Sequence, residues 1–203
     1  LRFCEEWMVK YKEKVINHNP FSTGKKSKLK IVFMMSNFDY HVNPDMVYDT
    51  FRILTEIPGV DLVVKPHTRS NKVWQFKEAV EKFNLQLAIN TPSNSLIKWA
   101  DAVIVYGSSI AIQVLYDKKV LIYPRYIDSN HFILDDMNSC WGIDNLNQFR
   151  DAIEKLIKNP SYRPYSADDV TKAIRKLVYA DKDDRNVIDN HVQFIKAKVK
   201  KFY

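Results

Sequence analysis

Glycine and cysteine are both scarce in this sequence, with 4 glycines and 2 cysteines among 203 residues. No G-x-G-x-x-G motif and no G-x-x-x-x-G-K-[ST] loop is present, which argues against a nicotinamide dehydrogenase and against a P-loop ATPase. Cys4 and Cys140 lack the spacing of a metal site and do not form a disulfide framework. This cysteine usage fits a reducing, cytoplasmic setting.

Long apolar runs are also missing. No run approaches the roughly 20 residues that cross a bilayer, and no signal peptide is visible. The chain opens on Leu1 inside a helical pattern, so we expect a fragment or a processed piece of a longer protein.

Positive charge exceeds negative charge, with a formal net charge of +7 and a pI near 9.2. This balance points to anionic partners such as nucleotides, nucleic acid or acidic lipid. Much of the excess lies in residues 23–30 (TGKKSKLK) and 196–201 (KAKVKK). The simplest interpretation of these two segments is that they are solvated, and a peripheral contact with the inner face of a membrane is the alternative.

Apolar runs alternate with helical patterns along most of the chain. Continuous apolar character predicts strands in residues 29–36, 60–67, 85–90, 101–107 and 119–124, and helices are predicted between them and after residue 145. Such strands are typical of a parallel sheet covered on both faces. We therefore predict an α/β fold with a doubly wound, mostly parallel, Rossmann-like sheet of about five to six strands and extra helices at both termini.

The pattern divides into three parts: an N-terminal helix and linker (1–28), a Rossmann-like nucleotide-binding domain (29–160) and a C-terminal helical extension (161–203). Helix-start chemistry is visible at three places. Pro44 suits a first helical turn, Thr91 suits an N-cap with Pro92 as the first helical residue, and Ser166 suits a cap. Residues 125 to about 141 are expected to be rich in loops.

Polar residues follow several of the predicted strands directly. In an open parallel sheet the carboxyl ends of the strands share one edge, and ligands bind beyond that edge. The candidates for binding the nucleotide and its phosphates are Ser36, Lys65, His67, Arg69, Gly107, Ser108 and Ser109. Asp39, His41, Arg125 and Tyr126 lie at the same edge and are read as loop residues.

Two short motifs carry this prediction. Gly107 permits a sharp turn and close ligand approach, and Ser108 or Ser109 can offer a hydroxyl and an N–H group to a phosphate oxygen; a plain turn with a serine cap is the competing interpretation. Pro66 fixes the backbone before His67, which basic residues flank. An ordinary surface histidine is the alternative there.

A metal site receives little support from the sequence. Asp128, His131, Asp135 and Asp136 are close enough in sequence to hold a divalent ion, but a solvated loop is the default interpretation and we expect no metal. The aromatic residues follow strand and helix periodicity, which favours core positions over base-stacking platforms.

The basic-Pro-His sequence after the second strand, residues 99–115 (WADAVIVYGSSIAIQVL) and residues 119–124 (KVLIYP) together resemble a known family. The resemblance is to the C-terminal half of a GT-B glycosyltransferase of bacterial capsule, lipopolysaccharide or teichoic-acid synthesis. It covers about residues 30–160. It implies a Rossmann-like domain that binds a nucleotide-activated donor, with His67, Ser108 and Ser109 at the nucleotide and its phosphate.

The resemblance also implies partners and a mechanism. It implies a nucleotide-sugar donor, a glycan acceptor, an N-terminal GT-B domain and no further cofactor. The reaction would transfer a sugar or polyol phosphate, with electrostatic help to the departing nucleotide from His67, Ser108 and Ser109. The sequence has Pro66-His67 where the family pattern has His-Pro, and it shows no second Rossmann unit and no general base. The chain would therefore be inactive or very weak alone.

Three other functions remain open from the sequence. A sugar-nucleotide epimerase shares the architecture but needs carboxylates in its cleft. A non-catalytic binding or assembly module would use the same edge residues only as caps. Nucleic-acid binding through the basic termini is a further alternative, and no specific nucleic acid is expected.

Overall fold

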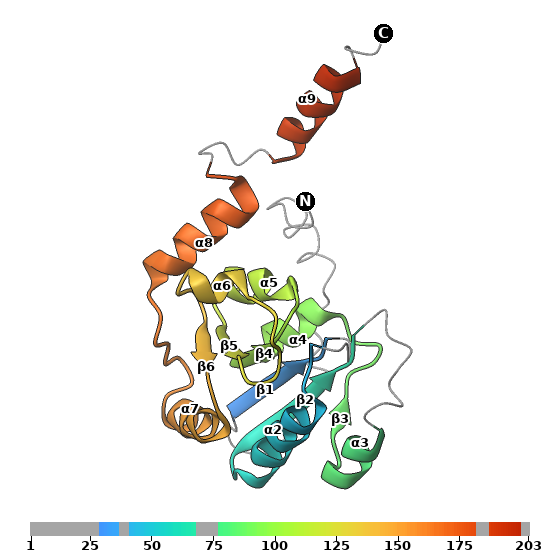
Figure 1. The fold of residues 1–203 in the computed structure, drawn as a ribbon, viewed down its shortest axis with the longest axis vertical. Coiled ribbons are helices and arrows are strands. Elements are labelled where there is room, and N and C mark those ends of the chain that lie inside the picture. Colours follow the sequence, from blue (N-terminus) through green and yellow to red (C-terminus); the bar gives the residue numbers. More distant parts are fainter. Residues whose placement is uncertain (1–28, 37–40, 68–76, 182–186, 200–203) are drawn as a thin grey trace.

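Six short strands form one parallel sheet (Figure 1). We analysed a computed structural model that describes residues 29–36, 41–67, 77–181 and 187–199; the predicted N-terminal helix and linker lie outside these ranges. The strand order is β3-β2-β1-β4-β5-β6, which confirms the predicted Rossmann-like sheet. The strands are β1 (Leu29–Met34), β2 (Val60–Lys65), β3 (Gln86–Leu87), β4 (Ala102–Val105), β5 (Val120–Pro124) and β6 (Trp141–Ile143).

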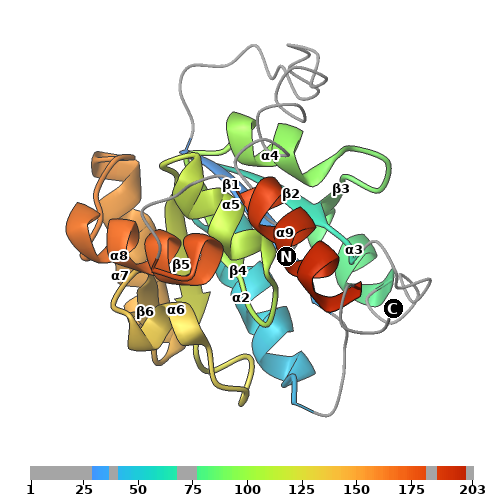
Figure 2. The same cartoon turned by 90° about the horizontal axis from the view of Figure 1, so that it is seen from above.

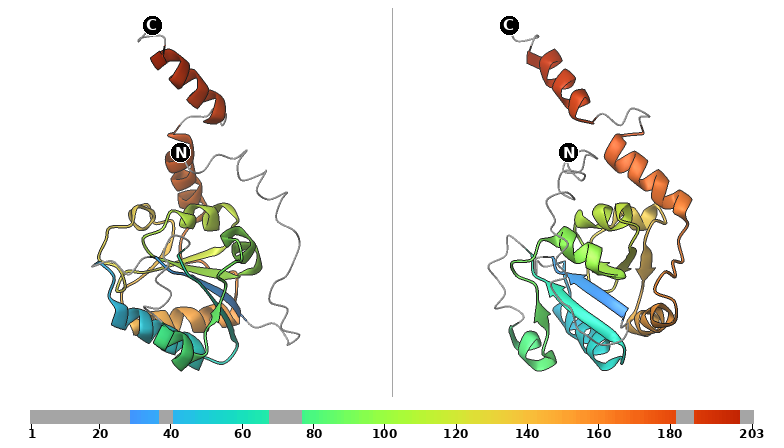
Figure 3. Two further views of the ribbon diagram at one scale, coloured as in Figure 1. Left: turned by 90° about the vertical axis from the view of Figure 1, so that its right-hand side faces the viewer. Right: turned by 180° about the vertical axis from the view of Figure 1, so that it is seen from behind.

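Helices cover both faces of the sheet, as Figure 3 shows from two sides. Helices α2 (Pro44–Glu56), α3 (Lys77–Phe83) and α7 (Leu146–Lys158) cover one face. Helices α4 (Ser93–Trp99) and α5 (Ile110–Tyr116) cover the other, and α8 (Ala167–Tyr179) packs on the outside of α5. The short α6 (Ile133–Asp136) follows β5, and α9 (Val187–Val199) continues beyond α8, away from the sheet (Figures 1 and 2).

The core explains why the strand sequences are apolar without alternation. The strands lie between two helical layers, so the residues on both of their faces are removed from water. Ile31, Val32, Phe33 and Ile104 have no exposed surface. On the face covered by α2, the ring of Phe33 lies 4.9 Å from that of Phe51, centroid to centroid. Burial of this central sheet is the main stabilising contribution to the fold.

The predicted helix starts have mixed outcomes. Pro44 does begin α2, after an Asn43 cap whose side chain accepts from the amides of Asp45 and Met46. Ser166 does cap α8, since its hydroxyl accepts from the amide of Asp169.

The prediction for α4 was wrong. This helix begins at Ser93, and Pro92 is the capping residue rather than the first helical residue. The reason is that Pro92 keeps an extended ψ of 139°, so the helical turn starts one residue later and Thr91 is not the cap. The region expected to be loop-rich contains α6 and leads directly into β6 at Trp141.

Candidate functional site at the strand switch point

The strand order reverses at β1, which pairs with β2 on one side and β4 on the other. The connections from these two central strands leave toward opposite faces of the sheet. In folds of this kind ligands bind between the loops beyond the carboxyl ends of two such strands, and we refer to this place as the β1–β4 crevice. Ser36 lies two residues after β1, and Gly107 lies two residues after β4. The Ser36 Oγ is 3.6 Å from the place a Cβ atom on Gly107 would occupy, so the structure brings these two predicted residues together.

Gly107 takes a conformation that other residues rarely adopt, with φ of +58°. The chain thus turns sharply between β4 and the first turn of α5, as the sequence predicted. The positive φ places the bare Cα hydrogens against the loops that follow β1 and β5, where a side chain would collide. Glycine is required here both for the backbone conformation and for the close approach.

The start of α5 is not closed by a side-chain cap. Ser109 is the capping residue in αR conformation, and its hydroxyl makes no capping hydrogen bond. The Ser108 hydroxyl accepts from the amide of Ile110 over a long 3.5 Å. The amides of Ser108 and Ser109 have no acceptor within the described part of the chain. Among the described residues, these two main-chain N–H groups and the Ser109 hydroxyl therefore remain able to donate hydrogen bonds to an anion after β4.

A third strand contributes a residue that the sequence suggested only as a metal ligand. Asp128 follows β5, is 5% exposed, and accepts a 2.8 Å hydrogen bond at Oδ1 from the amide of Asn130. Its Oδ2 atom lies 2.8 Å from the place a Gly107 Cβ would occupy. Sequence reasoning missed this position because no local pattern shows that a loop aspartate is folded back against β4.

The loop that carries Asp128 is held against the loop that follows β1. Val42 and Asp128 form an isolated antiparallel bridge. The Asn43 amide donates to the Ile127 carbonyl over 2.8 Å, and the Ser129 amide donates to the His41 carbonyl over 3.0 Å. These main-chain bonds fix the position of the Asp128 carboxylate, which a solvated loop would leave variable.

A buried tyrosine lies close to Ser36 and Asp128. Tyr106 has no exposed surface, and its ring meets that of Phe33 edge-on at 5.9 Å. Its hydroxyl lies close to the main chain of Ser36 and to the carboxylate of Asp128, yet makes no hydrogen bond of ordinary geometry within the described ranges. Burial raises the pKa of Tyr106, and the nearby carboxylate raises it further, so the hydroxyl stays protonated as a potential donor.

The residues predicted after β2 have different surroundings. The Lys65 side chain is buried, and its Nζ donates to the carbonyls of Ala88 (2.9 Å) and Ile89 (2.7 Å). Burial lowers the pKa of Lys65. This ammonium group is directed to the β3 side of β2, away from the β1–β4 crevice. His67 is half-buried two residues after β2, and Arg69 lies outside the described residues.

The other edge residues have structural partners. Arg125 binds Asp135 and Asp144 through its guanidinium group, with 2.6 Å contacts to each. The Tyr126 hydroxyl lies 2.9 Å from the Thr50 hydroxyl of α2. Asp135 was also one of the possible metal ligands, and across the ranges that the structure describes no group of three such side chains is placed to hold a metal ion.

Comparison with known proteins places the fold. No protein-family model matches the sequence, and no curated protein matches it. Among solved structures, the spinosyn rhamnosyltransferase SpnG bound to its aglycone superposes with a TM-score of 0.52 at 16% identity, over 73% of this chain and 41% of SpnG.

Two further structures give the same result. TarM matches with a TM-score of 0.51 at 14% identity, over 83% of this chain and 35% of TarM. Anabaena Alr3699/HepE in complex with UDP-glucose matches with 0.53 at 8% identity, over 83% of this chain and 48% of HepE. The chain is structurally similar to GT-B glycosyltransferases. It spans less than half the length of these three proteins, and at such identities the likeness is one of fold.

Proposed function

We propose that this chain is the donor-binding half of a GT-B glycosyltransferase and that it holds a nucleotide-activated sugar in the β1–β4 crevice. One observation carries the proposal: Ser36, Gly107 and Asp128, from the loops after three strands, converge at the switch point. Beside them lie two amides that have no acceptor among the residues that the structure describes. Two structures of similar fold support the proposal, since SpnG is in complex with thymidine diphosphate, a nucleoside diphosphate, and HepE with UDP-glucose, a nucleotide sugar.

The groups around the crevice suit a diphosphate on one side and hydroxyl groups on the other. The amides of Ser108 and Ser109 and the Ser36 hydroxyl are donors and would receive phosphate oxygens. The Asp128 carboxylate is an acceptor and would repel a phosphate, so it would receive hydroxyl groups of the sugar or ribose. His67, at the end of the adjacent β2, would supply a further donor, with Arg69 beside it in sequence.

The catalytic contribution follows from the same groups. When the bond between the sugar and the diphosphate breaks, negative charge grows on the leaving phosphate oxygen. Donors that already point at this oxygen stabilise the transition state more than the ground state. Within this chain the contribution is therefore electrostatic help to the departing nucleotide. The acceptor site and the general base would come from an N-terminal domain that the resemblance implies.

The surroundings of such an enzyme are also proposed. We assign it to synthesis of a surface polysaccharide, as the resemblance implies, at the cytoplasmic side of a membrane. No helix in the described ranges has the length and apolar character to cross a bilayer. Helix α9 leaves Phe194 (62%) and Ile195 (57%) exposed near Lys196 and Lys198, a combination that suits contact with acidic lipid.

Calorimetry on the 203-residue chain tests the proposal directly. CMP, CDP, UDP and thymidine diphosphate should be titrated in turn, each followed by a corresponding nucleotide sugar. We expect one nucleotide diphosphate or monophosphate to bind with a micromolar to millimolar Kd. Ser36→Ala, which removes the hydroxyl donor of the crevice, should weaken binding several-fold. Ser95→Ala, which removes a serine hydroxyl in α4 outside the crevice, should leave binding unchanged. Absence of heat with every nucleotide would favour a non-catalytic module.

A further inference from the structure

The hydroxyl of Tyr106 is buried without a hydrogen-bond partner. Tyr106 has no exposed surface, and among the described residues its hydroxyl makes no hydrogen bond. The ring is fixed in the core, since its centroid lies 5.9 Å from that of Phe33. Tyr106 directly precedes Gly107, so this hydroxyl belongs to a residue at the proposed donor site. A phenylalanine would avoid the cost of burying an unpaired hydroxyl, which points to a role beyond packing.

Groups from two neighbouring loops surround this hydroxyl. Burial raises the pKa of Tyr106, the charge of Asp128 raises it further, and a main-chain group of Ser36 opposes the rise. A main-chain group lowers the pKa of a phenol by donating toward its oxygen, so the Ser36 N–H group faces the Tyr106 oxygen. The proton of the Tyr106 hydroxyl is then left to be donated, and the Asp128 carboxylate is an acceptor close by.

The Asp128 carboxylate is itself short of donors. The residue is buried, and its Oδ1 atom accepts from the Asn130 amide over 2.8 Å. Among the described residues, its Oδ2 atom accepts no hydrogen bond, and no lysine, arginine or histidine nitrogen lies within 4.0 Å of the carboxylate. A buried carboxylate without a cation depends on hydrogen bonds to its charged form. Tyr106 has an unused donor, and Asp128 has an unused acceptor.

An anion at the start of α5 would bring a second negative charge to this place. The Oδ2 atom of Asp128 lies against Gly107, and the amides of Ser108 and Ser109 follow directly in the chain. A phosphate held by these amides would adjoin the carboxylate, and like charges repel strongly where little water separates them. The repulsion would turn the carboxylate away from Gly107. Rotation about the Cβ–Cγ bond of Asp128 would direct it to the Tyr106 hydroxyl.

We propose that Tyr106 is a positioning residue of the donor site, and that its hydroxyl donates to Asp128 when a phosphate occupies the loop after β4. This role rests on the proposed function. The hydrogen bond stabilises the charge of the carboxylate, so Asp128 can stay beside a phosphate and still accept from hydroxyl groups of the sugar or ribose. Because Tyr106 has no exposed surface, it acts through Asp128 and does not touch the ligand.

Tyr106→Phe removes only the hydroxyl and is made in the 203-residue chain. Without nucleotide no hydrogen bond is lost, so the unfolding equilibrium constant in urea should rise by no more than about twofold. Tyr165→Phe is the matched control, because the Tyr165 hydroxyl accepts from the Leu121 amide over 2.9 Å. Loss of that hydrogen bond should raise the unfolding constant by about two- to tenfold.

Nucleotide affinity should respond in the opposite order. The probe is whichever of CMP, CDP, UDP and thymidine diphosphate binds the parent chain most tightly in calorimetry. Tyr106→Phe should weaken its binding at least about fivefold, because the complex loses a hydrogen bond to a charged group. Tyr165→Phe acts at Leu121 near the amino end of β5, outside the crevice, and should change the Kd by less than about twofold.

Asp128→Asn separates positioning from packing. The neutral amide leaves no repulsion to offset, so adding Tyr106→Phe to Asp128→Asn should change the Kd by less than about twofold. Asp128→Asn thus rescues the affinity that Tyr106→Phe loses, which a purely structural effect of the hydroxyl would not allow. With isotope-labelled tyrosine Cζ atoms, nucleotide should also shift the Tyr106 resonance, which Tyr106→Phe identifies by its absence.

Four results would overturn this role while the proposed function stands. They are an unchanged Kd in Tyr106→Phe, an equal loss of affinity with and without Asp128→Asn, a Tyr106 Cζ resonance that nucleotide does not shift, and a loss of stability as large as that of Tyr165→Phe. The last result would mean that the Tyr106 hydroxyl already has a partner in the free chain. If no nucleotide binds the parent chain, the proposed function fails, and the role of Tyr106 fails with it.

Discussion

The Oδ2 atom of Asp128 lies 2.8 Å from the position that a Cβ atom on Gly107 would occupy. Real Cβ atoms do not approach other atoms so closely, so this contact exists only because residue 107 is glycine. The two residues come from loops after different strands and are 21 positions apart in the sequence. Their proximity places the hydrogen-bond donors of the loop after β4 next to the carboxylate of the loop after β5.

Gly107→Ala should therefore damage both the fold and the crevice. Alanine at φ of +58° costs about 1 to 2 kcal/mol of unfolding free energy from backbone strain alone, and the new methyl group would displace Asp128. We expect nucleotide affinity to fall at least about tenfold by calorimetry. Gly59→Ala is the matched control, because Gly59 has φ of +91° but nothing within 4 Å of its would-be Cβ.

A double variant separates collision from strain. In Gly107→Ala with Asp128→Ala the carboxylate is gone and only the strain remains, so part of the lost stability should return, as a coupling energy of about 0.5 to 2 kcal/mol. If the changes in unfolding free energy caused by the two substitutions, measured in urea, are additive, Asp128 does not occupy the position described. If Gly59→Ala weakens nucleotide binding as much as Gly107→Ala, the effect at Gly107 is not local to the crevice.

Asp128→Asn should affect the affinity for the nucleotide and the additional affinity from the sugar differently. The neutral amide removes repulsion toward a phosphate, so the bare nucleoside diphosphate should bind equally well or up to about tenfold more tightly. The amide also removes a charged acceptor for hydroxyl groups, so the additional affinity contributed by the sugar should shrink. The measurement is the ratio of the two Kd values. An unchanged ratio would remove Asp128 from the sugar side of the site.

Gly142 is expected to hold a purely structural position. A Cβ atom at Gly142 would collide with the Arg125 guanidinium and with an Asp135 oxygen, which form a short ion pair. Gly142→Ala should therefore lower the unfolding free energy by about 1 to 3 kcal/mol in urea. Nucleotide affinity should stay within about twofold, because the Arg125 cluster lies outside the crevice. A stability equal to that of the parent chain would contradict this arrangement.

Cys140 should be a poor nucleophile in the folded chain. Its thiol is buried, and burial, followed by the charge of Asp135, raises its pKa above the ordinary value of 9.0. In a Cys4→Ser background, Ellman's reagent at pH 8 should react with native Cys140 on the order of a hundredfold more slowly than after denaturation. Comparable rates in the native and denatured chains would show that the thiol is accessible.

The same thiol should make stability depend on alkaline pH. The folded state binds the proton more tightly than the unfolded state, so the contribution of Cys140 is complete below pH 9.0 and declines as the pH rises above it. The unfolding free energy should fall as the pH rises above 9.0, and Cys140→Ala should flatten this fall. An identical slope in the two proteins would assign the decline to other groups.

Much of the fold could be predicted from sequence because the decisive features are local. Five strands are continuous apolar runs, and Pro44 and Ser166 begin their helices through neighbours in sequence. The three-residue β6 is too short to show a period, and its pairing with β5 depends on tertiary packing. Pro92 could not be placed because both the cap and the first helical turn accept proline.

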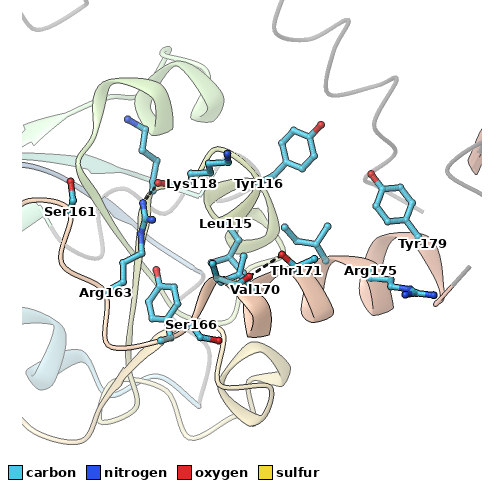
Figure 4. A pocket seen from close by; sticks show the side chains of 14 residues that line it. Leu115, Tyr116, Lys118, Ser161, Arg163, Ser166, Val170, Thr171, Arg175 and Tyr179 are labelled. Atoms are coloured by element: carbon cyan, nitrogen blue, oxygen red, sulfur yellow. Dashed lines mark hydrogen bonds between the residues drawn. The ribbon is translucent and has the colours of Figure 1, made fainter. Parts of the chain in front are cut away.

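The candidate site was only partly accessible to sequence reasoning. Ser36 and Gly107 were identified because strand ends share one edge, and this rule needs only the strand order. Asp128 could not be identified in this way, because its position depends on a loop that folds back between β1 and β4. Tyr106 has the sequence pattern of an ordinary core aromatic residue, and only the fold places its hydroxyl near Asp128. The hollow between α5 and α8, which Leu115, Arg163 and Val170 line (Figure 4), likewise could not be predicted, because it depends on how the two helices pack.

Amide chemical shifts during a nucleotide titration test the central claim most directly. With the best-binding nucleotide from calorimetry, we expect the largest shifts in a nitrogen–proton correlation spectrum to fall on Ser36, Gly107, Ser108 and Ser109. Shifts confined to residues outside the β1–β4 crevice, or no shifts at all, would contradict a donor site at this place.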